Sequence, residues 1–453
     1  MMEPAKPRSE PRVLIIGAGS AGLLMAQVLK KVRLLATTQV QQPISSLIDN
    51  RQQAGIPTTV FEQDPSSTSR PRDWNFGIYW AQSRLEECLP PDLHALIKST
   101  QTDPTHEPSP DETLNIYNGN TGEVINRIPA PYSMRIRRRP WLELLKTGID
   151  VRYGKKLSSI SLSDSDATTV SLAFTDGTSE TGTLLIGAEG AHSPTREFLF
   201  KSSPQDALLK SCSIVTTATL TEFPSDISAE LAKLHPRHIV TFDPAGFFVW
   251  IGVHNRTPTT CTWMILVSWK SVEETGLRER GSEAILADLK ARAEGLSFPL
   301  REAIHSVPEG TRVWHSSLTY WPTKPWDNLN GKITLAGDAA HPMTFHRGQG
   351  LGNAITDAAE FQKCLSSSNN NNLVEAVTKY EKELWVRGLE AVQINLENTI
   401  AIHNWETLLQ SPIYKSGLKK DAEVGMSQEH SALEADREGK PVEGEKQGEL
   451  FDD

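Results

Sequence analysis

Short apolar runs that stop at glycine recur in the N-terminal part of the chain. Residues 12–16, RVLII, are rich in β-branched side chains and end at Gly17, which is typical of a buried parallel strand. Apolar residues then repeat at helical spacing over 21–31, and the sequence TTVFEQD at 58–64 predicts a second strand. This order of strand, helix and strand predicts a parallel α/β unit.

The pattern changes between about residues 211 and 320, where aromatic and β-branched segments alternate with turn residues. This predicts a mostly antiparallel sheet, interrupted by a helix over 281–295. Before it, Asp176-Gly177 predicts a hairpin turn, and a buried strand follows at 184–188. After it, a long helical region is predicted over 373–409. The fold class expected from these patterns is α/β with an antiparallel part.

Length, composition and charge narrow the possible classes of protein. The 453 residues are enough for about two domains, and the hydrophobic fraction of 38% is compatible with a folded enzyme. Of the net charge of −10, −7 lies in residues 420–453, which predicts an acidic disordered tail. The rest of the chain is near neutral, which gives no support for a nucleic-acid partner.

Targeting and metal signals are missing from the sequence. The N-terminal segment 1–11 lacks the apolar centre of a signal peptide and is predicted to be flexible, and no apolar run is long enough for a transmembrane segment. The cysteines are scattered without CxxC or zinc-ligand spacing, at Cys88, Cys212, Cys261 and Cys364. We therefore expect a cytoplasmic protein with no metal site and no disulfide framework.

The hexapeptide GAGSAG between the first strand and its helix is a G-x-G-x-x-G motif. Gly17 permits a tight turn, Gly19 lets a pyrophosphate approach the backbone, and Gly22 lets the helix pack closely on the strand. The start of the helix then offers free N–H groups and a partial positive charge to the phosphates. This context predicts a dinucleotide site.

The dinucleotide fingerprint also needs an acidic residue at the end of the second strand, about 20 residues further on. Glu62 ends that strand but lies 40 positions after Gly22. Without the 22 residues Val32–Gln53 the interval becomes 18, which fits. We therefore interpret 32–53 as an atypical insertion and Glu62 as the ligand of the ribose hydroxyls.

One genetic hypothesis explains the insertion. Valine codons begin with GT and glutamine can be encoded by CAG, so residues 32–53 can be the translation of a retained in-frame intron of 66 nucleotides. As protein, the segment extends a loop, where added length costs little closure entropy. A cDNA sequence tests this hypothesis, and a mature transcript that keeps all 66 nucleotides contradicts it.

Two more glycine-bearing strand ends follow, GAEGAHSPTR at 187–196 and GDAAHPMTFHRGQGLGNAITDA at 337–358. The three motifs in this order resemble the single-component FAD-dependent monooxygenases that include p-hydroxybenzoate and salicylate hydroxylases. The run GDAAHPMT…RGQGL is most similar to fungal secondary-metabolite members. The resemblance covers about residues 13–409. It implies a Rossmann-like FAD-binding domain, an interleaved, mostly antiparallel substrate domain, and a long C-terminal helix.

The resemblance also divides the chain. The FAD-binding domain is expected over 12–205, with the insertion and some segments of the substrate domain included. The antiparallel substrate domain is expected over 206–325. The return of the FAD-binding domain and the C-terminal helices are expected over 326–419.

Individual residues around FAD follow from the same resemblance. Asp338 is expected to bind the ribityl hydroxyls, and Arg138 to lie beside the phosphates and the ribityl chain. The helix that follows Gly348 is expected to point its positive end at the flavin. The full set of expected cofactor-binding residues is Gly17, Gly19, Ser20, Ala21, Gly22, Glu62, Gly77, Arg138, Asp338, Gly350, Leu351 and Gly352.

The activity implied by the resemblance is hydroxylation or epoxidation of a small aromatic or polyketide- or alkaloid-like substrate in fungal secondary metabolism. NADH or NADPH reduces FAD, and O₂ then forms a flavin C4a-hydroperoxide that delivers oxygen. The expected partners are therefore an aromatic or polycyclic small molecule, NAD(P)H and O₂.

The substrate is expected between the antiparallel sheet and the flavin. Candidate wall residues are Phe247, Phe248, Trp250, Trp263 and Trp321, although aromatic residues on strands commonly serve only as core. His238 and His341 are interpreted as structural or as part of a motif. No catalytic acid or base is assigned.

Three positions depart from the family pattern: Glu189 replaces the usual aspartate, Phe345 the usual proline and Gly352 the usual asparagine. Two other interpretations remain open. One is a different FAD enzyme, such as a reductase, a dehydrogenase or a halogenase, although the halogenase signature W-x-W-x-I-P is absent. The other is a non-catalytic product of a mis-spliced gene, which would purify without flavin colour.

Overall fold

The computed structural model describes residues 11–32, 56–70, 73–162, 169–271, 276–277, 279–369 and 372–418. Apart from Pro11 and Val32, the predicted flexible N-terminus (1–11), the insertion (32–53) and the acidic tail (420–453) lie outside the described residues.

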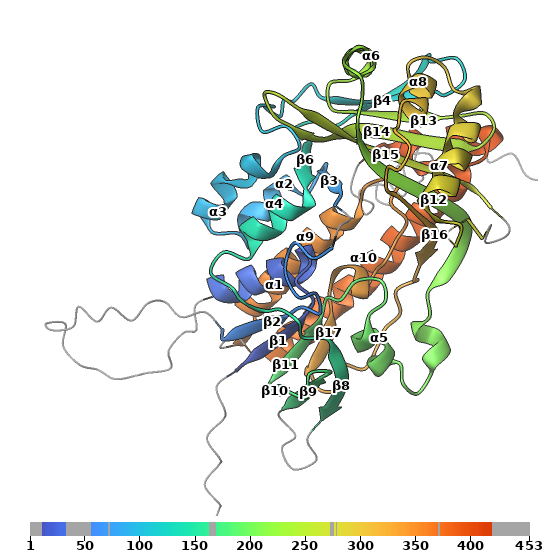
Figure 1. The fold of residues 1–453 in the computed structure, drawn as a ribbon. Coiled ribbons are helices and arrows are strands. Elements are labelled where there is room, and N and C mark those ends of the chain that lie inside the picture. Colours follow the sequence, from blue (N-terminus) through green and yellow to red (C-terminus); the bar gives the residue numbers. More distant parts are fainter. Residues whose placement is uncertain are drawn as a thin grey trace, which may run out of the picture.

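Two large sheets organise the described chain (Figure 1). The first is parallel throughout and consists, in spatial order, of β17 (Ile333–Leu335), β11 (Leu184–Gly187), β1 (Val13–Ile16), β2 (Thr58–Phe61) and β7 (Asp150–Arg152). Side chains of β1 alternate between two cores, because successive strand residues face opposite sides. The uniformly apolar sequence of β1 reflects burial on both faces.

Each face of the parallel sheet has its own cover. Helices α1 (Ser20–Lys31) and α9 (Gly350–Ser366) pack on one face. The other face carries a small antiparallel sheet of β10 (Ser179–Gly182), β9 (Val170–Phe174) and β8 (Leu157–Leu162). The predicted hairpin at Asp176-Gly177 joins β9 to β10, and Gly177 has the positive φ of +82° that such a turn requires.

The second large sheet has seven strands. In spatial order they are β16 (Val313–Tyr320), β12 (Lys210–Glu222), β15 (Cys261–Lys270), β14 (Phe247–Arg256), β13 (His238–Phe242), β4 (Thr113–Asn118) and β5 (Val124–Pro129). All neighbours are antiparallel except β13 and β4. Its outer face is covered by α6 (Ser225–Leu234), α7 (Gly281–Arg292) and α8 (Leu300–His305). Because β4 and β5 come from the first third of the sequence, the chain crosses between the two sheets more than once.

A two-stranded ribbon, β3 (Asn75–Ile78) with β6 (Met134–Arg137), lies between the two sheets in Figure 1. The remaining α-helices are α2 (Gln82–Cys88), α3 (Pro91–Ala95), α4 (Arg138–Leu145), α5 (Pro194–Leu199), α10 (Leu373–Ile402) and α11 (Pro412–Ser416). Short 3₁₀ turns occupy 97–100, 204–207, 293–295, 337–339 and 405–410. The predicted helix over 373–409 therefore ends at Ile402. Asn404 then caps a new turn by accepting a hydrogen bond from Glu406 N. None of the helices described is long and apolar enough to cross a membrane.

The two sides of segment 33–55 meet in the described structure. Ile56 N donates a hydrogen bond to Leu29 O at 3.0 Å, and both side chains are buried in the core around α1. Val32 N also donates to Val28 O, so α1 closes normally before the segment begins. The end of α1 and the approach to β2 are therefore adjacent in space, although 26 residues lie between Leu29 and Ile56 in the sequence.

Candidate functional site

One cavity of about 1000 Å³ is lined by both large sheets. We call one part the nucleotide end; it is lined by Gly17, Gly19, Glu62, Arg138 and Asp338. The other part, the sheet end, is lined by side chains of the seven-stranded sheet: Leu114, Ala218, Leu220, Val240, Phe248, Trp250, Met264, Leu266, Trp314 and Leu318. A nucleotide-sized group and an apolar group therefore have room in the same cavity.

The three glycines of the first motif have three different environments. Gly17 has a φ of +102°, and a Cβ there would overlap Ala188 O. A Cβ on Gly22 would overlap Gly17 O, so α1 can approach β1 only without a side chain. A Cβ on Gly19 would meet nothing within 4 Å, because this residue faces the open cavity. The backbone at Gly19 is therefore free to receive a phosphate.

Glu62 lies directly beside this loop. Its carboxylate accepts hydrogen bonds from Ala18 N at 2.9 Å and from Asp64 N at 3.0 Å. Arg70 lies 4.0 Å from the same carboxylate. Glu62 thus fixes the glycine loop and still lines the cavity, where its remaining acceptor positions face the nucleotide end.

Asp338 projects into the cavity from the turn after β17. Its side chain is exposed to the open cavity, and among the described residues none donates a hydrogen bond to its carboxylate. Partial desolvation within the cavity raises its pKa above the ordinary value; the charge of His341 opposes this shift, and that of Asp357 adds to it. Such a carboxylate is suited to accept hydrogen bonds from the hydroxyl groups of a ligand.

A fully buried network holds this turn in place. Asp357 accepts hydrogen bonds from Gly337 N at 2.7 Å, from His341 Nε2 at 2.8 Å and from Arg387 Nη2 at 2.7 Å. Burial opposes its ionisation, but the charges of His341 and Arg387 outweigh burial and lower its pKa to about 2. His341 is therefore a structural residue, which agrees with its interpretation from the sequence.

One of the cations that line the nucleotide end is Arg138, the first residue of α4. Its guanidinium lies 4.8 Å above the ring of Trp74, and among the described residues it has no carboxylate within ion-pair distance. Its neighbours behave differently, since Arg137 and Arg139 each lie 4.0 Å from Asp73. The structure therefore separates the three adjacent arginines, and only Arg138 of the three lines the cavity.

Most residues expected around FAD reach this cavity. Those that line it are Gly17, Gly19, Ser20, Ala21, Glu62, Gly77, Arg138, Asp338, Gly350 and Leu351. Gly22 is instead enclosed between α1 and β1, and Gly352 faces the indole of Trp80. The first turn of α9 borders the cavity through Gly350 and Leu351, so the positive end of this helix faces the cavity.

The second motif, residues 187–196, mainly fixes neighbouring backbone segments through side-chain hydrogen bonds. Glu189 is half-buried, and its carboxylate accepts hydrogen bonds from Ser193 Oγ at 2.8 Å and from Thr195 Oγ1. Arg196 donates to Ala207 O and Ala339 O, both at 3.0 Å, and to Ala191 O. Through Arg196, the second motif is tied to the turn that carries Asp338.

The aromatic residues proposed as substrate walls divide into two groups. Phe248 and Trp250 line the sheet end. Phe247 and Trp263 pack in the core on the outer face of the sheet, under α7 and α8, because alternate strand residues face opposite sides. Trp321 follows β16 and packs against Phe200 in the core around the parallel sheet. The wall prediction is therefore wrong for Phe247, Trp263 and Trp321.

Two departures from the family pattern have structural counterparts. Phe345 packs against Phe248 and His346, with ring centroids 6.3 and 4.2 Å away, so it closes part of the sheet end. A Cβ on Gly352 would meet the Trp80 indole at 2.9 Å. Trp80 thus occupies space that an asparagine side chain at position 352 would need.

Residues 142–384 match the family described as FAD binding domain. The FAD-dependent monooxygenase cctM of Talaromyces islandicus is 47% identical over 414 residues, which are 90% of this chain and 97% of that protein. This chain belongs to the FAD-dependent monooxygenases.

Other relatives of this monooxygenase agree. The FAD-dependent monooxygenase phnB of Penicillium herquei is 30% identical over 420 residues, 90% of this chain and 95% of that protein. Among solved structures, Klebsiella pneumoniae HpxO, complexed with FAD and uric acid, superposes with a TM-score of 0.67 at 18% identity. That match covers 94% of this chain and 97% of HpxO. The α/β fold expected from the sequence is confirmed.

The nucleotide end of the monooxygenase fits FAD on its own geometry. It offers an open backbone at Gly19, a carboxylate without a protein donor at Asp338, and a cavity-facing guanidinium at Arg138. Sequence reasoning did not single out several other cavity residues, namely Arg70, Trp74, Asn75, Tyr79, Arg135 and Trp314. Most of these follow Glu62 in the segment RPRDWNFGIYW or belong to the arginine-rich β6, but no motif spacing distinguishes them. Within the described residues, no group of three or more metal-ligating side chains is assembled.

Proposed function

We propose that this chain uses NAD(P)H and O₂ to hydroxylate or epoxidise a small aromatic or polyketide- or alkaloid-like molecule in fungal secondary metabolism. The observation that carries the proposal is the single cavity, which joins a nucleotide end to an apolar sheet end. A flat apolar substrate in the sheet end would lie next to the ring of a flavin whose phosphates occupy the nucleotide end.

Each part of the site has a distinct task in this proposal. Gly19 and the start of α1 hold the pyrophosphate, Glu62 binds the adenosine ribose and Asp338 binds the ribityl hydroxyls. When bound, FAD supplies the redox chemistry, namely reduction by a nicotinamide and activation of O₂. The positive end of α9 favours negative charge on the part of the flavin that it faces.

The sheet end excludes water rather than moving protons. Its walls are mostly aliphatic and aromatic, which protects a reactive oxidant from hydrolysis. His346 lines this end, but both ring nitrogens have partners, at 2.9 Å to Ser268 Oγ and 2.8 Å to Thr399 Oγ1. We therefore assign no catalytic acid or base, and orientation of the substrate is the task of the protein.

The test starts with the purified protein. We expect a yellow protein with bound FAD, whose oxidation of NADPH or NADH is accelerated by a hydroxylated polycyclic aromatic substrate. Under ¹⁸O₂, the product should gain one labelled oxygen. A reductase would oxidise the nicotinamide without transferring label, and a protein that purifies colourless and binds no added FAD would contradict the proposal altogether.

A further inference from the structure

The strand β6 carries two arginines on the same face, and their surroundings differ. Arg137 donates to Asn255 Oδ1 at 2.8 Å and lies 4.0 Å from the carboxylate of Asp73. Arg135, two residues earlier, lines the cavity, whereas Arg137 does not. No carboxylate of the described residues lies within ion-pair distance of Arg135. Arg135 is therefore a cation without a counter-ion beside an apolar cavity.

Neutral groups hold Arg135 in place. Its Nε donates to Asn75 Oδ1 at 2.6 Å, and Nη1 donates to Tyr79 Oη at 3.2 Å. The guanidinium lies 4.3 Å from the ring centroid of Trp250, a favourable cation–π position. A guanidinium has five N–H groups, so the two hydrogen bonds leave three donors for another partner.

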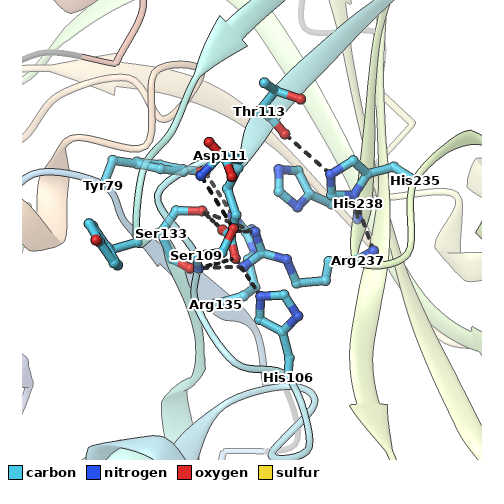
Figure 2. Close-up of polar contacts among 12 residues, drawn as sticks. Tyr79, His106, Ser109, Asp111, Thr113, Ser133, Arg135, His235, Arg237 and His238 are labelled. Carbon is cyan, nitrogen blue, oxygen red and sulfur yellow. Dashed lines mark hydrogen bonds and ion pairs between the residues drawn. The ribbon is translucent and has the colours of Figure 1, made fainter.

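The carboxylate of Glu112 is already used by another arginine, Arg237, whose surroundings are shown in Figure 2. Glu112 accepts hydrogen bonds from His106 Nε2 at 2.6 Å, from Ser133 Oγ at 2.7 Å and from Arg237 Nη2. Arg237 also donates to Ser133 O at 3.0 Å. Glu112 therefore balances the charge of Arg237 and leaves none for Arg135.

The neighbouring histidines supply no negative charge and take up no proton at neutral pH. Burial, and to a smaller extent the charge of Arg237, lower the pKa of His235 to about 4. Burial, His235 and Arg135 keep the pKa of His238 well below its usual value. Among the described residues, neither ring nitrogen of His238 has a hydrogen-bond partner, and its ring stacks on Trp250. Asp111, also labelled in Figure 2, is exposed and forms no ion pair with Arg135, so the charge of Arg135 has no counter-ion among the described residues.

A cation without a counter-ion in an apolar environment costs free energy unless a ligand supplies negative charge and hydrogen-bond acceptors. The positions around Arg135 belong to the sheet end, where Phe248, Trp250 and Met264 provide flat apolar walls. A ligand that satisfies both the cation and the walls is an aromatic ring with an acidic oxygen.

We propose that Arg135, held by Asn75 and Tyr79 over Trp250, binds an anionic oxygen of the aromatic substrate and thereby sets substrate specificity. The anionic group is a carboxylate or an ionised phenol, which share the ability to accept charge-assisted hydrogen bonds from the guanidinium. This inference rests on the proposed function, because it names the class of molecule that occupies the sheet end.

The test compares charged and neutral probes of equal shape on the FAD-loaded protein. Binding of 2-naphthoate and 2-naphthamide is measured by calorimetry, and 2-naphthol with 2-methoxynaphthalene distinguishes a phenol from a carboxylate. Arg135→Gln removes the charge. Arg137→Gln is the matched control, because it removes an arginine from the same face of the same strand outside the cavity. FAD content and melting temperature show whether each variant remains folded.

For the wild type, we expect naphthoate or ionised naphthol to bind at least about 10-fold more tightly than its neutral partner. Arg135→Gln should remove this preference, weakening the anion by about 10- to 100-fold and the neutral probe by less than about twofold. Arg137→Gln should leave the preference intact.

Three results would overturn the inference: a wild type that binds neutral probes as tightly as anions or binds none, an equal effect of both arginine variants, or loss of FAD in Arg135→Gln. The last result would assign Arg135 to the cofactor instead. Charge-selective binding without any transfer of ¹⁸O would overturn the proposed function and leave the role of Arg135 standing, so the two failures are distinguishable.

Discussion

The glycine loop at the nucleotide end of the cavity is built from backbone, whereas the sheet end is built from side chains. At the nucleotide end, Gly17, Gly19 and Gly22 lie within six residues, and two of them are fixed by contacts with backbone oxygen atoms. At the sheet end, Leu114, Phe248 and Trp314 come from three strands far apart in the sequence.

This difference determines how each end responds to substitution. Backbone carbonyls cannot move aside without moving a strand, so the steric overlap of a new Cβ in the glycine loop cannot relax at low cost in free energy. Apolar side chains on strands can exchange for others of similar volume with limited cost. We therefore expect the nucleotide end to determine whether the protein folds and binds FAD, and the sheet end to determine what it oxidises.

The largest effect is expected from Gly17→Ala. The positive φ of Gly17 and the overlap of a new Cβ with Ala188 O should destabilise the fold by about 3 kcal/mol or more. Gly19→Ala is the matched control, since its Cβ meets only open cavity. We expect Gly17→Ala to lower the melting temperature of the apoprotein and Gly19→Ala to weaken only FAD binding. Equal losses of apoprotein stability would break the distinction between the two glycines.

Asp338→Asn should separate folding from FAD binding. Loss of charged hydrogen bonds to the ribityl hydroxyls should weaken FAD affinity by about 10- to 100-fold, measured by fluorescence titration. In the apoprotein, the same substitution is expected to increase stability instead. Because the folded-state pKa of Asp338 is raised, its ionised form costs stability as pH rises above the ordinary aspartate value of 3.8.

The asparagine variant does not titrate at position 338. Its apoprotein should therefore melt higher than the wild-type apoprotein at pH 7, and this advantage should shrink as pH falls towards 4. A variant that is less stable than the wild type at neutral pH, with and without FAD, would contradict the role of Asp338 as a carboxylate reserved for the ligand.

Removal of Val32–Gln53 should stabilise the nucleotide end. Two residues, Ala54 and Gly55, would then connect Lys31 to Ile56, and the Leu29–Ile56 hydrogen bond would become the 6→1 bond of a Schellman motif. Glycine would occupy the position that this motif reserves for a left-handed residue. A shorter connection should also stabilise the fold by about 2 kcal/mol through loop closure.

We expect the deletion variant to melt a few degrees higher than the full chain and to retain FAD, measured by calorimetry and absorbance. Replacement of the same 22 residues by a glycine–serine linker of equal length is the control. If the deletion melts lower than this control, residues 32–53 contribute to stability and are not an insertion.

The smallest effect on folding is expected from Phe248→Leu at the sheet end. A volume-conserving change on this wall should cost less than about 1.5 kcal/mol, and FAD content should not change. The affinity for 2-naphthoate should fall by severalfold because a flat contact surface is lost. A large loss of FAD in this variant would show that the two ends are energetically coupled.

The same contrast explains what the sequence could reveal. The strand–glycine–helix arrangement of β1 and α1 depends on neighbouring residues, so its composition predicts it directly. Glu62 could be found by spacing, once residues 32–53 were set aside. Asp338 could be found because the surrounding motif is long.

The features that the sequence did not predict depend on contacts between residues far apart in the chain. Phe247 and Phe248 are adjacent and chemically identical, and only the packing of α7 and α8 on one face decides which of them reaches the cavity. Arg135 lacks a counter-ion because Glu112 pairs with Arg237. No local pattern in β6 encodes this pairing. The end of α10 at Ile402 likewise depends on Asn404 beginning a new turn.

The hydrogen bond between Leu29 and Ile56 also makes this position a natural place to open the chain. It joins the carboxyl end of α1 to the approach to β2, at the edge of the parallel sheet opposite the cavity. Because the contact is made by residues on both sides, it does not rely on one particular connection between them. New chain termini, or a fused reporter domain, could be introduced here as a circular permutant, and FAD and the aromatic substrate would meet an unaltered cavity.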